Sequence, residues 1–263
     1  MYNVSISTNK LTIGYLSGHQ PSAVSCQTIV QTDLDFSLNA GEMVCMLGPN
    51  GCGKSTLLRT LAGLQPALSG EYRLIIANSQ QSTAKSIALV LTERLSMENT
   101  TVHDIVAMGR YPYTSFLGGL TDEDEQIIEE ALRQVGFESH QHSAFSIQNT
   151  MFNAHSDGEK QRILIAKALA QQTPIILLDE PTAHLDLPHR ILVLRLLRQL
   201  AHEQGKTVLI STHELDLALA LSDRILLMTP KKGIQLDTAE NLKKTDAFTS
   251  AFGMDIFNPL GGK

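Results

Sequence analysis

A glycine-rich stretch, GPNGCGKS at residues 48–55, constrains the fold of this chain more than any other feature. It matches the pattern G-x-x-x-x-G-K-[ST] through Gly48, Gly53, Lys54 and Ser55. The apolar run before it (42–47) predicts a strand and the run after it (54–64) predicts a helix, which is the context in which this pattern binds phosphate. Glycines let backbone N–H groups converge on phosphate oxygens, the helix N-terminus adds positive potential, and the lysine adds a charge. The stretch therefore predicts a P-loop for a nucleoside phosphate, with Ser55 as a ligand of Mg²⁺.

The rest of the loop is expected to line the same site. Its other members, with the residue that follows Ser55, are Pro49, Asn50, Gly51, Cys52 and Thr56. Cys52 could serve as a redox sensor, but a small side chain that fills a tight turn is the preferred interpretation. With Cys26 and Cys45 it forms no CxxC pair or metal-binding spacing, which favours a reducing compartment.

A second motif, IILLDE at residues 175–180, complements the loop. A buried apolar strand would deliver Asp179 to its C-terminal end, where the carboxylate can hold a phosphate-bound Mg²⁺ through water. Glu180, one residue further, is placed to polarise an attacking water molecule. Four aliphatic residues and an acid are weak support alone, but paired with the glycine loop they predict a nucleotide-hydrolysing site.

The wider pattern is α/β. Residues 42–76 have the order strand, glycine loop, helix, strand, which predicts a β–α–β unit in a parallel sheet. A second block contains β-type runs at 175–178 and 207–211, separated by a helical pattern at 191–205 that closes with Gly205. Between the blocks the signal is mainly helical.

The clearest of the intervening helices is TDEDEQIIEEALRQVGF, residues 121–137. Thr121 can cap it and acidic residues fill its first turn. One apolar face before Gly136 is formed by Ile127, Ile128, Ala131, Leu132 and Val135. The acidic run could be read as a metal site, but a solvated helix N-terminus is the preferred interpretation.

Composition excludes several classes of protein. With 263 residues, 43% hydrophobic and 18% charged, the chain can bury a normal core as one large domain or as a core with an inserted subdomain. A formal charge of -6 gives no general reason to bind nucleic acid or anionic lipid. The N-terminus has no apolar signal-type segment, and no apolar run is long enough to span a membrane. A cytoplasmic protein that reaches a membrane only through a partner is expected.

With these motifs in order, the chain resembles the ATP-binding cassette (ABC) ATPases from about Leu11 to at least Arg224. Tyr15 matches the aromatic residue that stacks on adenine, Asp186 in AHLD matches the D-loop, and His213 in STHELD matches the switch histidine that contacts the γ-phosphate. The resemblance implies a RecA-like P-loop core with a parallel sheet, an N-terminal antiparallel β part and an inserted helical subdomain. It implies ATP and Mg²⁺ as ligands, with Glu180 and His213 as catalytic residues.

The family's LSGGQ signature is altered here. The aligned residues 155–159 read HSDGE, so three of five positions differ. Ser156 followed by Glu159 also fits a capping box at a helix start. In a head-to-tail dimer the signature of one subunit offers a hydroxyl, a backbone N–H and a helix N-terminus to the γ-phosphate bound by the other. Ser156 and Gly158 retain these elements, Glu159 is expected to orient the loop, and Asp157 is expected to face away from phosphate.

The segment TVHDIVAMGRYPYT (101–114) is similar to the ATPases of iron–siderophore, haem or cobalamin importers, through Gly109, Arg110 and Pro112. A plain helix that ends at a glycine and a proline turn is the alternative. The resemblance implies a homodimer that binds integral-membrane permease subunits at the inner face of the cell membrane and works indirectly with a solute-binding protein. The other interpretations are an importer ATPase for a different small solute, an ABC ATPase without a permease, as in iron–sulfur cluster assembly, or an unrelated P-loop kinase or switch protein.

The expected organisation is a first core part at 1–94, a helical subdomain at 95–162 that ends with the signature, and a second core part at 163–263. One departure from the family falls at the Q-loop, where Thr92 occupies the place of a glutamine. A threonine reaches less far, so we expect Thr92 to transmit the nucleotide state more than to bind the metal directly. His140 and His142 form an HxH pair in a polar segment, for which no metal is expected.

Overall fold

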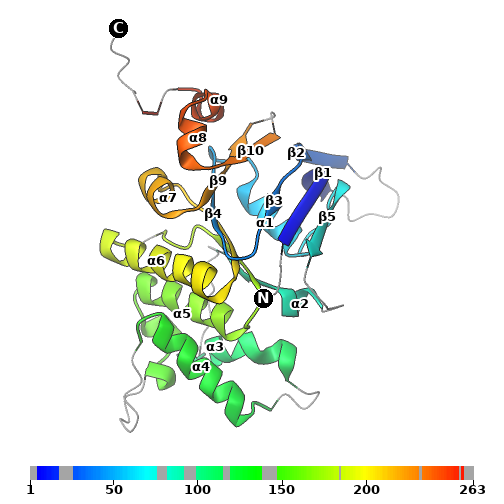
Figure 1. The fold of residues 1–263 in the computed structure, drawn as a ribbon. Helices are drawn as coiled ribbons and strands as arrows, with labels where there is room; N and C mark the ends of the chain where they lie inside the picture. The colour runs from blue at the N-terminus through cyan, green and yellow to red at the C-terminus, as the bar shows by residue number, and fades with distance from the viewer. Residues whose placement is uncertain are drawn as a thin grey trace.

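The computed structural model describes residues 5–17, 26–75, 82–91, 99–114, 119–137, 147–183, 185–230, 233–254 and 256–257. Its largest feature is a six-stranded sheet in which only β10 runs antiparallel to its neighbour (Figure 1). In spatial order the strands are β10 (Gly233–Asp237), β9 (Arg224–Thr229), β4 (Met43–Leu47), β8 (Thr207–Ser211), β7 (Ile175–Asp179) and β6 (Ile87–Val90). The predicted α/β core with a parallel sheet is confirmed.

The central strands are apolar throughout because both faces of the sheet are covered. In β4, Met43, Cys45 and Leu47 pack into one hydrophobic cluster, whereas Val44 and Met46 pack into the other. All five residues are buried. A strand covered on both faces reads as a continuous apolar run, which explains why MVCML lacks the alternation of a half-exposed strand.

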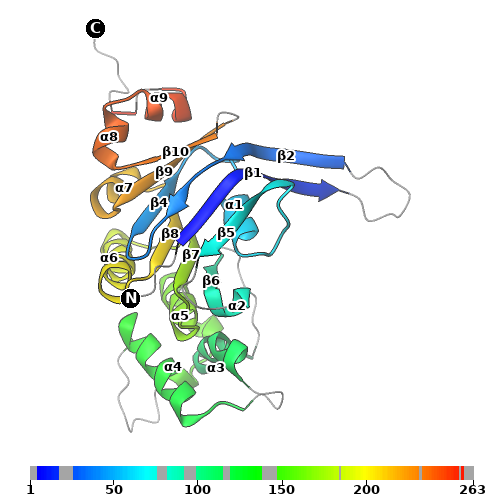
Figure 2. The same cartoon turned by 45° about the vertical axis from the view of Figure 1, so that its right-hand side comes forward.

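A second, antiparallel sheet lies on the other side of α1 (Lys54–Leu61) from the main sheet (Figure 2). It contains β2 (Cys26–Leu34), β1 (Ser5–Ser17), β3 (Ser37–Leu38) and β5 (Ser69–Ile75). The helix packs on both β1 and β7, and its Leu57, Leu58 and Leu61 are fully buried. The predicted N-terminal antiparallel part is confirmed, and it closes one face of the nucleotide core.

The β–α–β unit predicted for residues 42–76 is wrong in its last strand. β5 does not enter the main sheet but pairs antiparallel with β1, from Ser5↔Ile75 to Thr12↔Ser69. The reason is visible in its side chains, since partly buried Tyr72 and Leu74 alternate with exposed neighbours. One face of β5 meets solvent, which suits an antiparallel sheet and not the doubly covered core.

A layer of helices covers the opposite face of the main sheet and extends below it (Figure 1). Its lower part, here called the helical layer, consists of α3 (Val102–Ala107), the 3₁₀ helix η1 (Met108–Tyr113), α4 (Asp122–Gln134) and α5 (Asp157–Ala170). α5 packs against α3, α4 and η1 and also against β6 of the sheet. It is therefore the element that joins the helical layer to the core.

The remaining helices are short except for one. α6 (Leu187–Gln204) follows β7 as predicted and ends at Gly205, whose φ of 67° is the left-handed value typical of a helix C-terminus. The others are α2 (Thr83–Ser86), η2 (Ile147–Asn149), η3 (Phe152–Ala154), α7 (Leu215–Leu221), α8 (Ala239–Lys243) and α9 (Ala247–Phe252). Among the residues that the structure describes, no helix combines the length and the apolarity needed to cross a membrane.

The acidic start of α4 differs from its prediction at one residue. The cap is confirmed, because the Thr121 side chain accepts from the Asp124 N–H and the Asp124 carboxylate accepts from the Thr121 N–H. Asp122, Glu123 and Glu125 are exposed, as a solvated helix N-terminus requires. Asp124, however, is only 6% exposed and accepts a 2.7 Å hydrogen bond from Arg110 Nε. Sequence spacing gave no sign of this ion pair, because fourteen positions separate its partners.

Candidate active site

The P-loop is shaped by close packing against neighbouring strands. Gly53 precedes α1 with a φ of 105°, and a Cβ at this position would lie 2.7 Å from Val30 Cγ1 of β2. At Gly48 a Cβ would lie 2.7 Å from the Met228 carbonyl oxygen of β9. Only glycine fits at either position, which explains in this molecule why the motif needs both.

Lys54 lies inside the loop that it follows. Its Nζ donates to the carbonyl oxygens of Gly48 (2.9 Å) and Pro49 (3.2 Å), and the residue is 6% exposed. Asn50 and Gly51 at the tip of the loop are exposed, whereas Cys52 is buried. Burial raises the pKa of the Cys52 thiol, so the side chain stays neutral and packs in the turn. Burial also raises the pKa of the Cys45 thiol, to about 12.

Two residues from the antiparallel sheet reach the loop. The Tyr15 hydroxyl forms a 2.8 Å hydrogen bond with Thr56 Oγ1 at the start of α1, and the tyrosine is 50% exposed. An exposed ring tethered beside the loop can stack on a base. Gln31, which sequence reasoning missed, is 2% exposed and donates through Nε2 to the carbonyl oxygens of Cys52 (2.9 Å) and Thr229 (3.0 Å). A lone glutamine in a strand carries no motif, so nothing in the sequence distinguished it.

Asp179 ends β7 at the same edge of the sheet, because β4, β8 and β7 are parallel and their C-terminal ends coincide. It is 7% exposed and accepts a 2.5 Å hydrogen bond from Ser211 Oγ of β8. The same Ser211 oxygen accepts from the Glu180 N–H at 2.9 Å. Ser211 therefore fixes the Asp179 carboxylate and the Glu180 backbone, a role that the sequence did not reveal.

Glu180 is turned out of the strand by a φ of 48°, and its Oε1 lies 2.6 Å from His213 Nε2. The structure thus brings together the two residues predicted to be catalytic, although 33 positions separate them in the sequence. Both side chains are partly exposed, at 33% for Glu180 and 45% for His213.

Asp186, the predicted D-loop residue, caps α6. Its side chain accepts from the His189 N–H at 3.2 Å and contacts the His189 ring. Hydrogen bonding from His189 holds the pKa of Asp186 below its usual value.

The altered signature begins α5. The predicted capping box is confirmed: the Ser156 side chain accepts from the Glu159 N–H at 3.3 Å, and Glu159 Oε2 accepts from the Ser156 N–H at 3.0 Å. Asp157 is exposed, and its Oδ1 lies 3.8 Å from Lys160 Nζ. Gly158 is half-buried, and a Cβ there would meet Leu185 Cδ2 at 3.0 Å. The signature is thus an ordered, solvent-facing helix end.

The other end of α5 is held by Arg110. Its Nη1 donates to the Ala170 carbonyl (2.9 Å) and to Gln172 Oε1 (3.0 Å), and its guanidinium lies 4.2 Å from the centre of the Tyr113 ring. The Asp124 carboxylate completes this set. Arg110 therefore ties η1 and α4 to the point where α5 enters the core.

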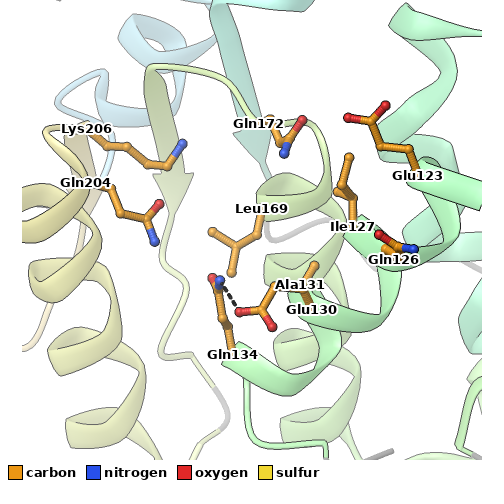
Figure 3. A pocket seen from close by; sticks show the side chains of 10 residues that line it. All are labelled: Glu123, Gln126, Ile127, Glu130, Ala131, Gln134, Leu169, Gln172, Gln204 and Lys206. Atoms are coloured by element: carbon orange, nitrogen blue, oxygen red, sulfur yellow. Dashed lines mark hydrogen bonds between the residues drawn. The ribbon is translucent and has the colours of Figure 1, made fainter. Parts of the chain in front are cut away.

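An open groove of about 440 Å³ runs along this junction, between α4 and the ends of α5 and α6 (Figure 3). Figure 3 shows Gln126, Gln134 and Gln172 around it, with Lys206 on the core side. Lys206 and the chain before β7 mark the N-terminal ends of the strands, so the groove lies at the opposite sheet edge from Asp179 and Ser211. It is a seam between the helical layer and the core and not the nucleotide site.

Several predicted residues lie outside the part of the chain that the structure describes, namely Thr92, His140 and His142. Within the described ranges, no group of three or more His, Cys, Asp or Glu side chains is arranged to hold a metal ion. One buried carboxylate beside a serine-bearing phosphate loop nevertheless fits Mg²⁺, which proteins commonly hold through one or two carboxylates together with the phosphates of the substrate.

Comparison with known proteins agrees with this geometry. Residues 31–183 match the ABC transporter family. The chain is 34% identical to the iron(3+)-hydroxamate import ATP-binding protein FhuC of Bacillus subtilis, over 95% of this chain and 88% of FhuC. A metal-chelate type ABC transporter in an inward-facing conformation contains a chain with a TM-score of 0.77 and 31% identity, over 96% of this chain and 90% of that one. The dimeric cassette MJ0796 matches with a TM-score of 0.72 and 26% identity, over 89% of this chain and 98% of that one. This chain therefore belongs to the ABC transporter family and is one of its ATP-hydrolysing ATP-binding subunits.

Proposed function

We propose that this chain powers the uptake of a metal chelate, of the iron–siderophore, haem or cobalamin kind, by hydrolysing ATP beneath membrane permease subunits. The observation that carries the proposal is the joint placement of the P-loop, Asp179 and the Glu180–His213 pair at one sheet edge. The cargo class rests on the similarity to FhuC and to the metal-chelate type transporter. The segment with Gly109, Arg110 and Pro112 supports the same subgroup.

In our proposal the loop and its neighbours bind ATP through backbone N–H groups and a few side chains. The backbone N–H groups of Gly48 and residues 50–54 and the α1 N-terminus surround the phosphates, and Lys54 exchanges its two carbonyl partners for phosphate oxygens. Tyr15 stacks its half-exposed ring on the adenine. Ser55 and Asp179 hold Mg²⁺, which supplies positive charge to the transferring phosphate group when it is bound.

The hydrolytic step falls to Glu180. Its carboxylate orients the attacking water and accepts a proton from it, while Ser211 keeps the Glu180 backbone in position. In our proposal His213, whose Nε2 lies 2.6 Å from Glu180 Oε1, contacts the γ-phosphate. Because the Glu180 side chain is partly exposed, water can reach it.

Two subunits complete the site. In our proposal the P-loop of one subunit faces Ser156, Gly158 and the α5 N-terminus of the other, in the manner of a dimeric cassette, and Asp186 couples the two sites. Hydrolysis reopens the pair, and the helical layer passes the motion to the permease at the inner face of the membrane. A solute-binding protein acts on the far side without contacting this chain.

Uptake measurements on cells test the cargo class. Cells that lack the gene for this chain are compared with cells that carry wild-type or Glu180→Gln copies, using radioactive iron–hydroxamate, haem and labelled cobalamin. We expect uptake of one of these chelates to require the wild-type copy. Normal uptake of all three in the deletion strain, with ATP hydrolysis intact in the purified chain, would contradict the importer proposal and leave the ATPase standing.

A further inference from the structure

Two of the positions at which the signature departs from LSGGQ carry side chains that contact each other. His155 Nδ1 lies 3.6 Å from Glu159 Oε2, one helical turn further along the chain. The His155 side chain is 12% exposed and that of Glu159 is 38% exposed. A histidine and a glutamate thus stand together where the family has a leucine and a glutamine.

The hydrogen bonds around His155 fix which nitrogen carries a proton in the neutral ring. Thr150 donates its only hydroxyl hydrogen to the Ile147 carbonyl oxygen at 2.6 Å. Its oxygen also lies 2.6 Å from His155 Nε2 and must therefore accept a hydrogen from that nitrogen. The neutral ring then presents a bare lone pair at Nδ1 to the Glu159 carboxylate. Only the imidazolium offers a hydrogen there, so the contact attracts in the charged ring and not in the neutral one.

Glu159 competes for the hydroxyl that the signature needs. Its Oε2 accepts from Ser156 Oγ at 2.8 Å as well as from the Ser156 N–H. These hydrogen bonds, led by the one from the serine hydroxyl, hold the pKa of Glu159 below its usual value. The carboxylate is therefore charged at neutral pH and engages the Ser156 hydroxyl hydrogen that a γ-phosphate would otherwise receive.

The other charged groups near the start of α5 offset one another, so the net charge there depends on whether His155 is charged. Asp157 and Lys160 lie 3.8 Å apart and offset each other. Arg162 acts on Glu159 from a distance, but its guanidinium lies 4.4 Å from the centre of the Phe137 ring and donates to the Val135 carbonyl oxygen. Without a charge on His155 the start of α5 is close to neutral, and with it the start of α5 is positive.

We propose that His155 is a positioning residue of the signature, which as an imidazolium holds the Glu159 carboxylate and frees the Ser156 hydroxyl for the γ-phosphate bound by the partner subunit. The inference rests on the proposed head-to-tail dimer and adds the charge of His155 as a condition for its closure. Closure of the dimer on ATP should be easier when His155 is charged. The substitutions at 155 and 159 then compensate each other, because the histidine offsets the charge that the glutamate brings to a phosphate site.

The test is a double-mutant cycle in the Glu180→Gln background, in which ATP hydrolysis is expected to be at least about a hundredfold slower. Light scattering gives the ATP concentration for half-maximal dimerisation at about pH 6 and about pH 8, on either side of the ordinary histidine pKa. His155→Gln keeps a donor for Thr150 but cannot become charged. It should raise the required ATP concentration about fivefold at the lower pH, the effect of one partly exposed ion pair, and hardly at all at the higher pH. In the presence of Glu159→Gln, which still caps α5, His155→Gln should have no effect at either pH.

His103→Gln is the matched control, because His103 Nε2 lies 2.8 Å from Glu125 Oε2 on α3 and α4 and faces no proposed phosphate. It should leave dimerisation unchanged at both pH values, and thermal unfolding should show every variant folded. An equal loss from His155→Gln with and without Glu159→Gln would overturn the inference, since the ring would then serve structure alone. So would a loss that is the same at both pH values. If no variant dimerises with ATP at all, the proposed dimer itself fails, which is a different result from a dimer indifferent to His155.

Discussion

The P-loop and the signature helix end are both proposed to meet phosphate, yet they are built differently. The P-loop is backbone held between buried strands, where a Cβ added at Gly48 or Gly53 would lie 2.7 Å from a neighbouring strand. The signature is a solvent-facing helix start whose order comes from side-chain hydrogen bonds within one turn. A backbone cradle allows only glycine where the chain packs closely, so its sequence is constrained. A capped helix end requires only a hydroxyl, a free N–H and a compatible charge. This difference explains why the loop motif is intact while three of five signature positions have changed.

The largest expected effect lies at the far end of the signature helix, where Arg110 is buried with Asp124. Arg110→Met should lower the free energy of unfolding by about 3 kcal/mol, because a buried carboxylate loses its charged partner. Arg133→Met is the matched control, since its pair with Glu130 is exposed and should contribute little. Urea denaturation measures both. An equally small loss from Arg110→Met would mean that the helical layer does not depend on this junction.

The same junction predicts a pH dependence with a definite sign. Backbone hydrogen bonding from Thr121, followed by the Arg110 contact, holds the pKa of Asp124 below its usual value. A carboxyl with a depressed pKa in the folded state stabilises the fold above its unfolded pKa, and this stabilisation is lost as the pH falls through the folded value. Wild type should therefore lose stability below about pH 4, and Arg110→Met should lose less over the same range.

Next in size is the chemical step on the loop side. Glu180→Gln should bind Mg²⁺ and ATP but hydrolyse ATP at least about a hundredfold more slowly, or about 2.7 kcal/mol, because a water-orienting carboxylate is worth that order of magnitude. Glu203→Gln, an exposed glutamate on α6, should have normal turnover. Phosphate release under saturating ATP measures the difference. Normal turnover in Glu180→Gln would refute the assigned role.

Gly53→Ala tests the rigidity of the backbone cradle. The added Cβ meets Val30 at 2.7 Å in a left-handed conformation, so the loop must move. We expect about thirtyfold weaker binding of ATP to the monomer, close to 2 kcal/mol. Gly205→Ala shares a positive φ but meets no atom within 4 Å, so it should lower stability and leave ATP affinity intact. Equal ATP affinity in both variants would show that the cradle is more tolerant than its packing indicates.

The two regions also differ in what the sequence could reveal. The P-loop, the strand that ends at Asp179 and the Ser156 cap were predicted because each is a local pattern with a local cause. The partners that hold them were not, since Gln31 and Ser211 act through contacts between strands that no spacing records. The burial of Asp124 and the departure of β5 to the second sheet were predicted wrongly for the same reason, because each depends on what packs alongside.

The smallest expected effect separates a structural cap from a functional one. Ser156→Ala removes the cap of α5, and Thr101→Ala removes the same kind of capping box from α3, where Asp104 takes the place of Glu159. Each should cost about 1 kcal/mol of stability, the usual value for an N-cap. Only Ser156→Ala should also raise the ATP needed for dimerisation of the Glu180→Gln variant, by about fivefold, because the lost hydroxyl no longer donates to phosphate. ATP affinity of the monomer should stay at the wild-type value in both, unlike in Gly53→Ala. If the two cap variants changed dimerisation equally, Ser156 would act by holding its helix and not by touching the nucleotide. The signature would then not be a phosphate-binding site.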